Sequence, residues 1–421
     1  MTDPVTVPRA ADGPGYRQAG SVGAPANWLW GADWPDVRDL WSLQPGIAHL
    51  NHGSFGAVPR PVAEEQRRWQ ERAESNPVRF HRRELPAAVA AARAQVASFC
   101  CADPDGFAFV PNATTGVSTV LAAVSLQRGD EVLLTDHGYG AVRLAVERAC
   151  HRSGARPVTM PVPLTAADAT VRAAVLAGLS GRTRLAVVDH ITSPTARLFP
   201  VAELVADLRR ADVPVLVDGA HAPGQLQVDL TALAPDFWVG NFHKWCCSPR
   251  GSAGLFVADR WRDRVSPLVT SWGEGRGFPL SFDQSGTSDA SAWLATPAAL
   301  DLLSGLGWAR LRQHNRDLAA YGQRVLAAAL GLDPADLPQD PVSMRVLPLP
   351  ANAASSMETA DALQTTIAAR LSAETALVAW RDQGMLRVSA QAYNAPEEYD
   401  RLAAGLPALL TAGGARGLGE C

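Results

Sequence analysis

Short apolar stretches rich in β-branched residues alternate with longer segments of helical period through the middle of the chain. Strands that alternate with helical segments in this way predict a mostly parallel, doubly wound sheet. We therefore expect an α/β fold whose larger part is built on a seven-stranded sheet. The expected strands lie near residues 107, 131, 155, 184, 213 and 236, and at 253–257.

The remaining segments predict a second, smaller domain. From about residue 292 to 330, Ala- and Leu-rich helical patterns lead away from the strands. Beyond them, apolar runs and helical segments read as a small α+β fold, with strands at 344–349, 377–380 and 385–389. Earlier in the chain, we expect a short helix at 35–43, a strand at 47–50, a loop at 51–56 and helices at 60–75 and 85–100.

The domain organisation follows from these segments. A chain of 421 residues is long enough for two domains. We expect a large domain over 36–300 and a small C-terminal domain over 301–421. Residues 1–35 are rich in Gly, Pro and Ala without a sustained period, and they predict a flexible N-terminal arm.

Composition narrows the class of protein. Apolar residues make up 47% and charged residues 19%, which is typical of a soluble globular enzyme. A net charge of −4 and the lack of a basic run argue against a nucleic-acid partner. The sequence has no apolar stretch long enough for a membrane span and no signal pattern at its start, so we expect a cytoplasmic protein. Six cysteines without a CxxC spacing give no zinc motif, and no metal is expected.

One basic residue is unusual. Lys244 is the only lysine, and the other 37 of the 38 basic side chains are arginines. Arginine cannot be deprotonated in proteins, so it cannot serve as an amine nucleophile. A lone lysine can be a surface residue left by chance. Here it follows the apolar run 236–240, which places it on the loop after a buried strand and favours amine chemistry.

An acidic residue follows the preceding strand. Asp218 ends the apolar run 213–217, and in an open α/β sheet ligands bind outside the carboxyl ends of the strands. Asp218 and Lys244 are therefore expected to meet at one cleft. Pyridoxal 5'-phosphate (PLP) requires such a pair, because a lysine holds its aldehyde as a Schiff base and a carboxylate keeps its pyridine nitrogen protonated.

A series of ordered motifs carries a resemblance to a known family. The chain resembles class V, fold-type I PLP enzymes, and within them the isopenicillin N epimerase-like group, which includes hercynylcysteine sulfoxide lyases and enzymes of antibiotic biosynthesis. The likeness covers about residues 47 to 410. The motifs are LNHGSFG (50–56), NATTGV (112–117), DHGYGA (136–141), DHITSPTARLFP (189–200), DGAHAPGQ (218–225), GNFHKW (240–245), SGT (285–287) and LRVSAQAYN (386–394).

The phosphate of PLP is expected at a helix start. Thr114 and Thr115 follow a strand and open a helix that we expect to continue to Leu126, and free N–H groups at such an end attract phosphate. An ordinary Thr cap is the alternative. The resemblance adds Ser193 to the cofactor-binding residues, and it implies that Asn241 and His243 are phosphate ligands.

Two further cofactor contacts come from the resemblance. It implies that His221 hydrogen-bonds the 3-hydroxyl oxygen of PLP. It also implies an aromatic ring stacked on the pyridine from the turn after the second strand. His137 and Tyr139 both qualify for that position, and their spacing does not choose between them.

The resemblance also implies substrate contacts and a partner subunit. Arg387 matches a carboxylate-binding arginine, and an Arg fork binds a carboxylate with two hydrogen bonds. Asn51 and Ser54 lie in a segment placed over the substrate. Thr287 matches a residue that reaches the phosphate of a neighbouring subunit, which implies a homodimer with shared sites. Relatives often have Arg next, where this chain has Ser288.

The expected activity is PLP chemistry on an amino acid. Lys244, Asp218 and His221 would be the catalytic residues. We rank a C–S β-eliminating or otherwise deaminating lyase on a cysteine conjugate first, and an epimerase or a class V aminotransferase as alternatives. A desulfurase is disfavoured because no cysteine lies between Cys247 and Cys421. A non-catalytic PLP-fold protein is disfavoured because the Asp, His, Lys and Arg set is intact.

Overall fold

The computed structural model describes residues 34–414, which divide into two compact units. Among these residues, the sheet unit comprises 61–193 and 198–300, and the terminal unit comprises 34–60, 194–197 and 301–414. Almost all of the expected N-terminal arm lies outside the described residues.

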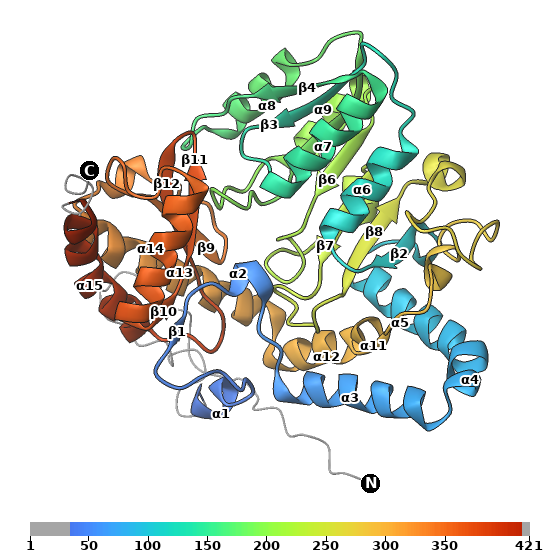
Figure 1. The fold of residues 1–421 in the computed structure, drawn as a ribbon, viewed down its shortest axis with the longest axis horizontal. Helices are drawn as coiled ribbons and strands as arrows, with labels where there is room; N and C mark the ends of the chain where they lie inside the picture. The colour runs from blue at the N-terminus through green and yellow to red at the C-terminus, as the bar shows by residue number, and fades with distance from the viewer. Residues whose placement is uncertain (1–33, 415–421) are drawn as a thin grey trace, which may run out of the picture. The chain divides into compact units, whose positions relative to one another are not determined.

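The sheet unit is built on a seven-stranded sheet with the order β2-β8-β7-β6-β5-β3-β4 among the described residues. Pairs between β7 and β4 are parallel, whereas β8 runs antiparallel to both of its neighbours. The expected mostly parallel α/β sheet is therefore confirmed (Figure 1). Its strands are β2 (Phe107–Val110), β3 (Glu131–Thr135), β4 (Arg156–Met160), β5 (Thr183–Asp189), β6 (Val215–Asp218), β7 (Phe237–Asn241) and β8 (Ala253–Val257).

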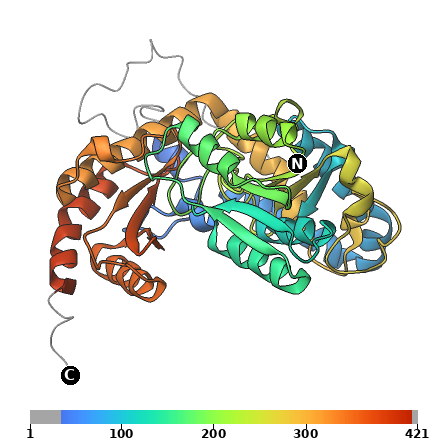
Figure 2. The same cartoon turned by 90° about the horizontal axis from the view of Figure 1, so that it is seen from above.

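Helices cover both faces of this sheet. Figure 2 shows the blue-green helix α7 on one face and the green helices α8 and α9 on the other. The helices that connect the strands are α6 (Ala113–Ala123), α7 (Gly140–Ser153), α8 (Asp168–Ala177), α9 (Val201–Arg210) and α10 (Leu230–Leu233). Helix α6 ends three residues before the expected Leu126, and its cap residue is Val124.

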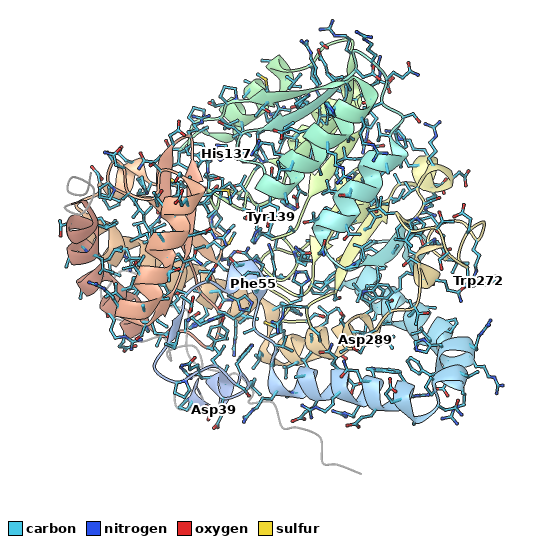
Figure 3. All side chains as sticks on the ribbon, viewed as in Figure 1. Asp39, Phe55, His137, Tyr139, Trp272 and Asp289 are labelled. Atoms are coloured by element: carbon cyan, nitrogen blue, oxygen red, sulfur yellow. The ribbon has the colours of Figure 1, made fainter. Side chains whose placement is uncertain are left out.

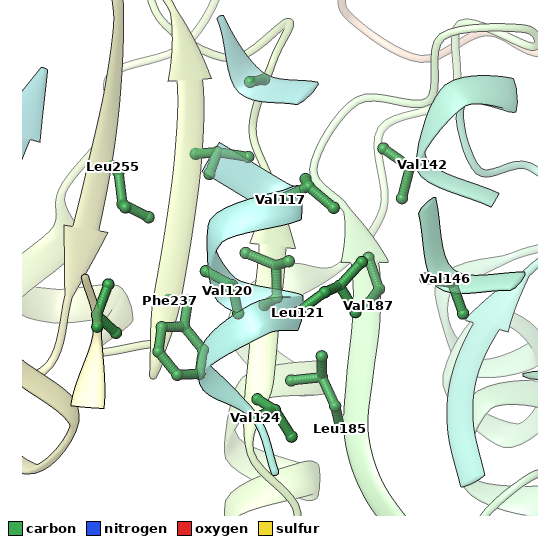
Figure 4. Packing of buried hydrophobic residues seen from close by; sticks show 14 of the residues in the cluster. Val117, Val120, Leu121, Val124, Val142, Val146, Leu185, Val187, Phe237 and Leu255 are labelled. Atoms are coloured by element: carbon green, nitrogen blue, oxygen red, sulfur yellow. The ribbon is translucent and has the colours of Figure 1, made fainter. Parts of the chain in front are cut away.

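Apolar side chains of α6 and α7 pack on the central strands. Val117, Val120 and Leu121 of α6 meet Leu185 of β5 and Phe237 of β7 in one buried cluster (Figure 4). Fully burying a Val, Leu or Phe side chain contributes about 1.5–3 kcal/mol, so this layer holds α6 firmly against the strands.

A glycine lets α6 approach the sheet closely. A Cβ added at Gly116 would lie 2.6 Å from Cγ1 of Val239, a distance that real Cβ atoms do not reach. The first turn of α6 is thereby held beside the carboxyl end of β7.

The outer helices of the sheet unit precede β2 or follow β8. They are α3 (Arg60–Ser75), α4 (Pro77–Arg79), α5 (Leu85–Phe99), α11 (Ser291–Leu294) and α12 (Thr296–Leu306). Between α4 and α5 the chain forms a π-helical segment, Phe80–Glu84, which the sequence pattern did not predict. The glycine-rich stretch around residue 275 is a loop.

The terminal unit has its own small sheets and helices. Strands β9 (Met344–Pro348), β11 (Ala376–Trp380) and β12 (Gln383–Ser389) form an antiparallel sheet with β12 in the middle. Its helices are α1 (Trp34–Arg38), α2 (His52–Phe55), α13 (Trp308–Leu330), α14 (Met357–Leu371) and α15 (Pro396–Gly414). The small α+β fold expected for the C-terminal part is present.

A short strand ties the start of the described chain to this unit. Strand β1 (Ala48–His49) pairs in parallel with β10 (Ala373–Glu374). Residues 36–60, expected in the large domain, group with the C-terminal part for this reason. The expectation of a plain loop at 51–56 was wrong in detail, because α2 is a helical turn there.

Two kinds of feature are absent from the described residues. Within residues 34–414, no helix combines the length and apolar character that a membrane span requires. The same part of the chain holds no group of three or more His, Cys, Asp or Glu side chains arranged to bind a metal ion.

Candidate active site

Three neighbouring parallel strands carry polar residues at their carboxyl ends. Asp189 ends β5 and Asp218 ends β6, and the two are paired in register across the sheet. Strand β7 ends at Asn241, and Lys244 follows in the turn. Since parallel strands end at the same edge, these side chains share one end of the sheet, where α/β folds bind ligands.

Lys244 contacts a histidine whose ring is oriented by a tryptophan. Its Nζ lies 3.1 Å from Nε2 of His221, and Nδ1 of the same imidazole accepts a hydrogen bond of 3.3 Å from Nε1 of Trp245. An indole N–H can only donate, so in a neutral imidazole the ring proton lies on Nε2. Nε2 then donates to the lone pair of Lys244, which suits a free amine, the nucleophilic form of lysine.

Asp218 is buried, and only 3% of its surface is exposed. Its Oδ1 accepts a hydrogen bond of 3.0 Å from the N–H of Ala220. Burial raises the pKa of Asp218, while the Ala220 N–H and the charge that Lys244 carries when protonated act in the opposite direction. A bound cationic pyridinium would compensate the cost of burying this carboxylate.

Some of the backbone N–H groups in the first turn of α6 are hydrogen-bonded to side chains of the protein itself. Asn112 caps it by accepting from the N–H of Thr115, and Oδ1 of Asn241 accepts from the N–H of Ala113 at 2.9 Å. Within the described residues, neither the N–H nor the hydroxyl of Thr114 donates a hydrogen bond to a side chain. It is the residue of this turn that remains able to receive a phosphate oxygen.

His243 is fixed to the neighbouring strand. Its Nδ1 donates a hydrogen bond of 2.9 Å to the carbonyl oxygen of Ser252. Burial, and secondly a positive charge on Lys244, lowers the pKa of His243 to about 4. The ring is therefore neutral at neutral pH, and it can offer only Nε2 to a ligand.

The two candidate stacking rings differ in environment. His137 is fully buried, its Nε2 donates to the carbonyl oxygen of Val162 at 2.7 Å, and it packs against Phe199. Tyr139 is 46% exposed at the start of α7. Both are labelled in Figure 3. His137 is thus already packed and hydrogen-bonded within the sheet unit, and Tyr139 is the ring that is open to a ligand.

In the terminal unit, the three expected substrate residues form one cluster, which we call the Arg387 cluster. Nη2 of Arg387 donates to Oγ of Ser54 at 3.0 Å and to Oδ1 of Asn51 at 3.3 Å. Ser54 in turn donates to Oδ1 of Asn51, whose amide donates to the carbonyl oxygen of Thr375. Arg387 is 4% exposed, so its guanidinium is oriented by neutral partners in a buried position.

Buried hydrogen bonds next to the Arg387 cluster hold its elements together. His52 of α2 and Tyr393 share a hydrogen bond of 2.8 Å, and Gln391 lies 3.4 Å from the other ring nitrogen of His52. Ser389, at the end of β12, hydrogen-bonds the carbonyl oxygen of Leu50. These contacts fix α2 on β12 and thereby hold Asn51 and Ser54 at Arg387.

Two further expected cofactor residues, Ser193 and Thr287, lie in turns or bends between the elements. Ser193 lies in the stretch closed by the isolated bridge between Ile191 and Leu198. Thr287 is exposed and lines a cavity of about 470 Å³ that is also lined by Phe80 of the π-helical segment and by Asp289. The roles of Ser193 and Thr287 stay predictions.

Two residues of the site were not singled out from the sequence. Asp189 is the register neighbour of Asp218, and Trp245 holds His221. The sequence feature that could have identified Asp189 as a site residue is its position at the end of an apolar strand, the same position that Asp218 has. Trp245 gave no such signal, because the apolar residue after a lysine reads as core.

The donor set of the sheet unit fits PLP. Nζ of Lys244 lies beside Nε2 of His221, Asp218 is a buried carboxyl at the end of β6, and Thr114 lies in the first turn of α6. These three features match the aldehyde, the pyridine nitrogen and the phosphate of the cofactor.

Comparison with known proteins agrees with this geometry. The family described as aminotransferase class V matches residues 56–402. The chain is 33% identical over 398 residues to isopenicillin N epimerase of Streptomyces clavuligerus, covering 90% of this chain and 98% of that protein. It is 33% identical to a putative L-cysteine desulfhydrase of Oryza sativa subsp. japonica, covering 85% of this chain and 83% of that protein. The solved cystine C–S lyase C-DES superposes with a TM-score of 0.75 at 23% identity, covering 87% of this chain and 98% of that one.

Proposed function

The chain belongs to the aminotransferase class V family of PLP-dependent enzymes, and from that premise we propose that it is a C–S lyase acting on a cysteine conjugate. The observation that carries the proposal is the chain of contacts from Trp245 through His221 to Lys244. It orients the amine of the only lysine of the protein at the carboxyl end of a parallel sheet.

PLP, when bound, supplies an electron sink for the pair of electrons left at Cα of an amino acid. Lys244 would hold the cofactor at rest, and Asp218 would face its pyridine nitrogen. His221 would then hold the amine of Lys244 in place by its Nε2 hydrogen. Thr114 and the first turn of α6 would bind the phosphate, with Asn241 fixing that turn to β7 and Nε2 of His243 available beside it.

The Arg387 cluster is proposed to bind the substrate α-carboxylate. A guanidinium already oriented by Asn51 and Ser54 loses little freedom on binding, which favours one carboxylate orientation. The anchored carboxylate would set which bond of Cα breaks. Lys244 would take the Cα proton as general base, and the Cβ–S bond would break with its electron pair leaving on sulfur. Addition of water to the remaining three-carbon fragment releases pyruvate and ammonia.

A lyase needs one base, and this chain has one lysine. An epimerase needs, in addition, a proton donor on the opposite side of Cα. The similarity to isopenicillin N epimerase over 90% of the chain supports epimerisation as the second candidate. Tyr139, which is 46% exposed, is the side chain we would assign to that second proton.

We also propose that the enzyme works as a homodimer in which Thr287 reaches the cofactor of the partner subunit. The support is the exposure of Thr287, together with its match to a family residue that reaches the phosphate of a neighbouring subunit. Dilution to monomers should then release PLP and abolish activity together, whereas a fully active monomer in sedimentation would contradict the shared site.

One experiment separates the two reactions. The purified holoenzyme is incubated in deuterated water with a panel of cysteine S-conjugates, and the products are identified by mass spectrometry. We expect thiol or sulfenate together with pyruvate and ammonia in equal amounts. Substrate that returns with deuterium at Cα, inverted configuration and an intact C–S bond, without keto acid, would establish the epimerase instead.

A further inference from the structure

Two buried carboxyls end neighbouring strands of the sheet, and only one of them has a role in the proposed function. We propose that Asp189 is the neutral member of this pair and positions Asp218 as the single anion. This inference rests on the proposed role of Asp218. Asp189 is accordingly a positioning residue, because it would act through Asp218 and not on the substrate.

The geometry of the pair comes from the strand register. Asp189 and Asp218 are Cα partners in the parallel ladder of β5 and β6, so their side chains lie on the same face of the sheet. Neighbouring strands lie about 4.8 Å apart. The two residues are 4% and 3% exposed, so water cannot screen one carboxylate from the other. Two negative charges on neighbouring strands in a buried position repel each other, and the pair is expected to keep one proton.

The surroundings decide which carboxyl holds the proton. Asp218 accepts a hydrogen bond of 3.0 Å from the N–H of Ala220, and a protonated Lys244 also stabilises its charge. The favourable interaction of Asp189 is with its own main-chain N–H. Burial and then the charge of Asp218 raise the pKa of Asp189 well above the ordinary range. Asp189 therefore stays protonated when Asp218 ionises.

The described groups beside Asp189 on the β3 side make polar contacts of their own. On the β3 side, a Cβ at Gly138 would lie 3.7 Å from Oδ2 of Asp189, so the carboxyl faces the turn after β3. In that turn, Asp136 accepts from the N–H of Val162 and His137 donates to the carbonyl oxygen of the same residue. Burial lowers the pKa of the adjacent His190 to about 4, so this imidazole is neutral.

A neutral carboxyl and an amide have the same inventory of one donor group and one acceptor oxygen. Asparagine at position 189 should therefore reproduce the neutral acid, whereas asparagine at position 218 removes the charge that faces the cofactor. Asp189→Asn and Asp218→Asn make the same chemical change at paired positions of adjacent strands. They form a matched test, with Asp189→Leu as the variant that loses the polar group altogether.

The first readout is infrared spectroscopy of the three holoenzymes at neutral pH, which is independent of turnover. We expect the wild-type enzyme to show the C=O band of a protonated carboxyl. This band should be missing from Asp189→Asn, and so appear as a lost band in its difference spectrum against wild type. It should still be present in Asp218→Asn. A difference spectrum of Asp189→Asn that shows no lost band of this kind would overturn the inference, because the proton would then lie elsewhere.

The second readout is turnover. We expect Asp218→Asn to lower kcat by about 30-fold or more, the loss typical of a buried charged partner. Asp189→Leu should lower kcat about tenfold relative to wild type. Asp189→Asn, which keeps a polar group, should have a kcat within about threefold of the wild-type value. If Asp189→Asn lost as much as Asp218→Asn, the charge of Asp189 would be required and the inference would be wrong. If instead Asp218→Asn turned over like wild type, the proposed function would fail, while the infrared band would still locate the proton.

Discussion

The two clusters of polar residues in this protein are built in different ways. The Lys244 cluster in the sheet unit draws on Asp218, His221, Lys244 and Trp245, which lie within 28 consecutive positions on two adjacent strand ends. The Arg387 cluster joins α2 to β12, and its members are 333 and 336 residues apart along the chain. The first is a product of local sequence and the second of long-range packing.

This difference has chemical consequences. The Lys244 cluster contains ionisable groups whose protonation depends on burial and on one another, as the raised pKa of Asp218 and the lowered pKa of His243 illustrate. The Arg387 cluster contains a permanent cation held by a hydroxyl and an amide, which do not titrate. We infer that the first cluster moves protons and the second only orients a substrate.

The largest expected effect falls on the Lys244 cluster. Lys244→Ala should lower kcat by about 10,000-fold or more, because it removes both the covalent anchor and the base. Lys244→Arg is the matched control for charge, and it should be equally inactive since arginine cannot lose its proton. Steady-state kinetics and cofactor content of both variants would measure this, and an active Lys244→Arg enzyme would refute the amine mechanism.

A smaller loss is expected when the carboxylate anchor is removed. Arg387→Ala should lower kcat/KM by about 30- to 4,000-fold, which corresponds to roughly 2–5 kcal/mol for a buried charged partner. Arg387→Lys keeps the charge but loses the planar fork, so it should recover only part of the loss. The absorbance of bound PLP should not change in either variant.

The control for this prediction is another arginine of the terminal unit. Arg381 lies exposed in the turn between β11 and β12, beside Trp380. Arg381→Lys should leave kcat/KM unchanged. Equal losses at positions 381 and 387 would mean that Arg387 acts through the stability of the unit and not through substrate binding.

The partners of Arg387 should matter less than the arginine itself. Ser54→Ala removes the hydroxyl that accepts from Nη2, and a hydrogen bond to a charged group contributes about 1.5–3 kcal/mol. We expect KM to rise by about tenfold, with kcat nearly unchanged. Ser54→Thr, which keeps the hydroxyl, serves as the control, and a Ser54→Ala effect confined to kcat would contradict an orienting role.

The smallest effect concerns stability at acid pH. The pKa of His243 is about 4 in the folded protein, below its ordinary value of 6.5, so the unfolded chain takes up the proton first as the pH falls. The free energy of unfolding should therefore decrease between pH 6.5 and about 4. His243→Asn should flatten this decrease in the Tm of the PLP-free protein, and the exposed His151→Asn should not. An unchanged slope in His243→Asn would show that the imidazole is not held neutral by the fold.

Much of the sheet unit was readable from the sequence. Each expected strand was found within a few residues of its predicted place, because buried parallel strands are continuous apolar runs. The ends of those runs also located Asp218 and Lys244. Asp189 stood in the same kind of position, but the pairing of β5 with β6 that makes it a neighbour of Asp218 is set by tertiary structure.

The Arg387 cluster could not be derived from local pattern. Nothing in the stretch 50–56 predicts that it packs on β12, since that contact depends on the pairing of β1 with β10 and on the buried His52–Tyr393 hydrogen bond. Only the family resemblance brought Asn51, Ser54 and Arg387 together in advance. The π-helical segment at 80–84 was likewise missed, because FHRRE has a single apolar residue, Phe80, and therefore shows no periodic pattern.

Borohydride reduction of the holoenzyme, followed by peptide mapping, tests most directly whether the sheet unit holds the cofactor and the terminal unit does not. Reduction fixes PLP irreversibly to the amine that carries it. We expect a single modified residue, Lys244, in wild type, and the same modification to the same extent in Arg387→Ala. A wild-type enzyme modified at its N-terminal amine, or not at all, would contradict the assignment of Lys244, and loss of the modification in Arg387→Ala would contradict the separation of the two roles.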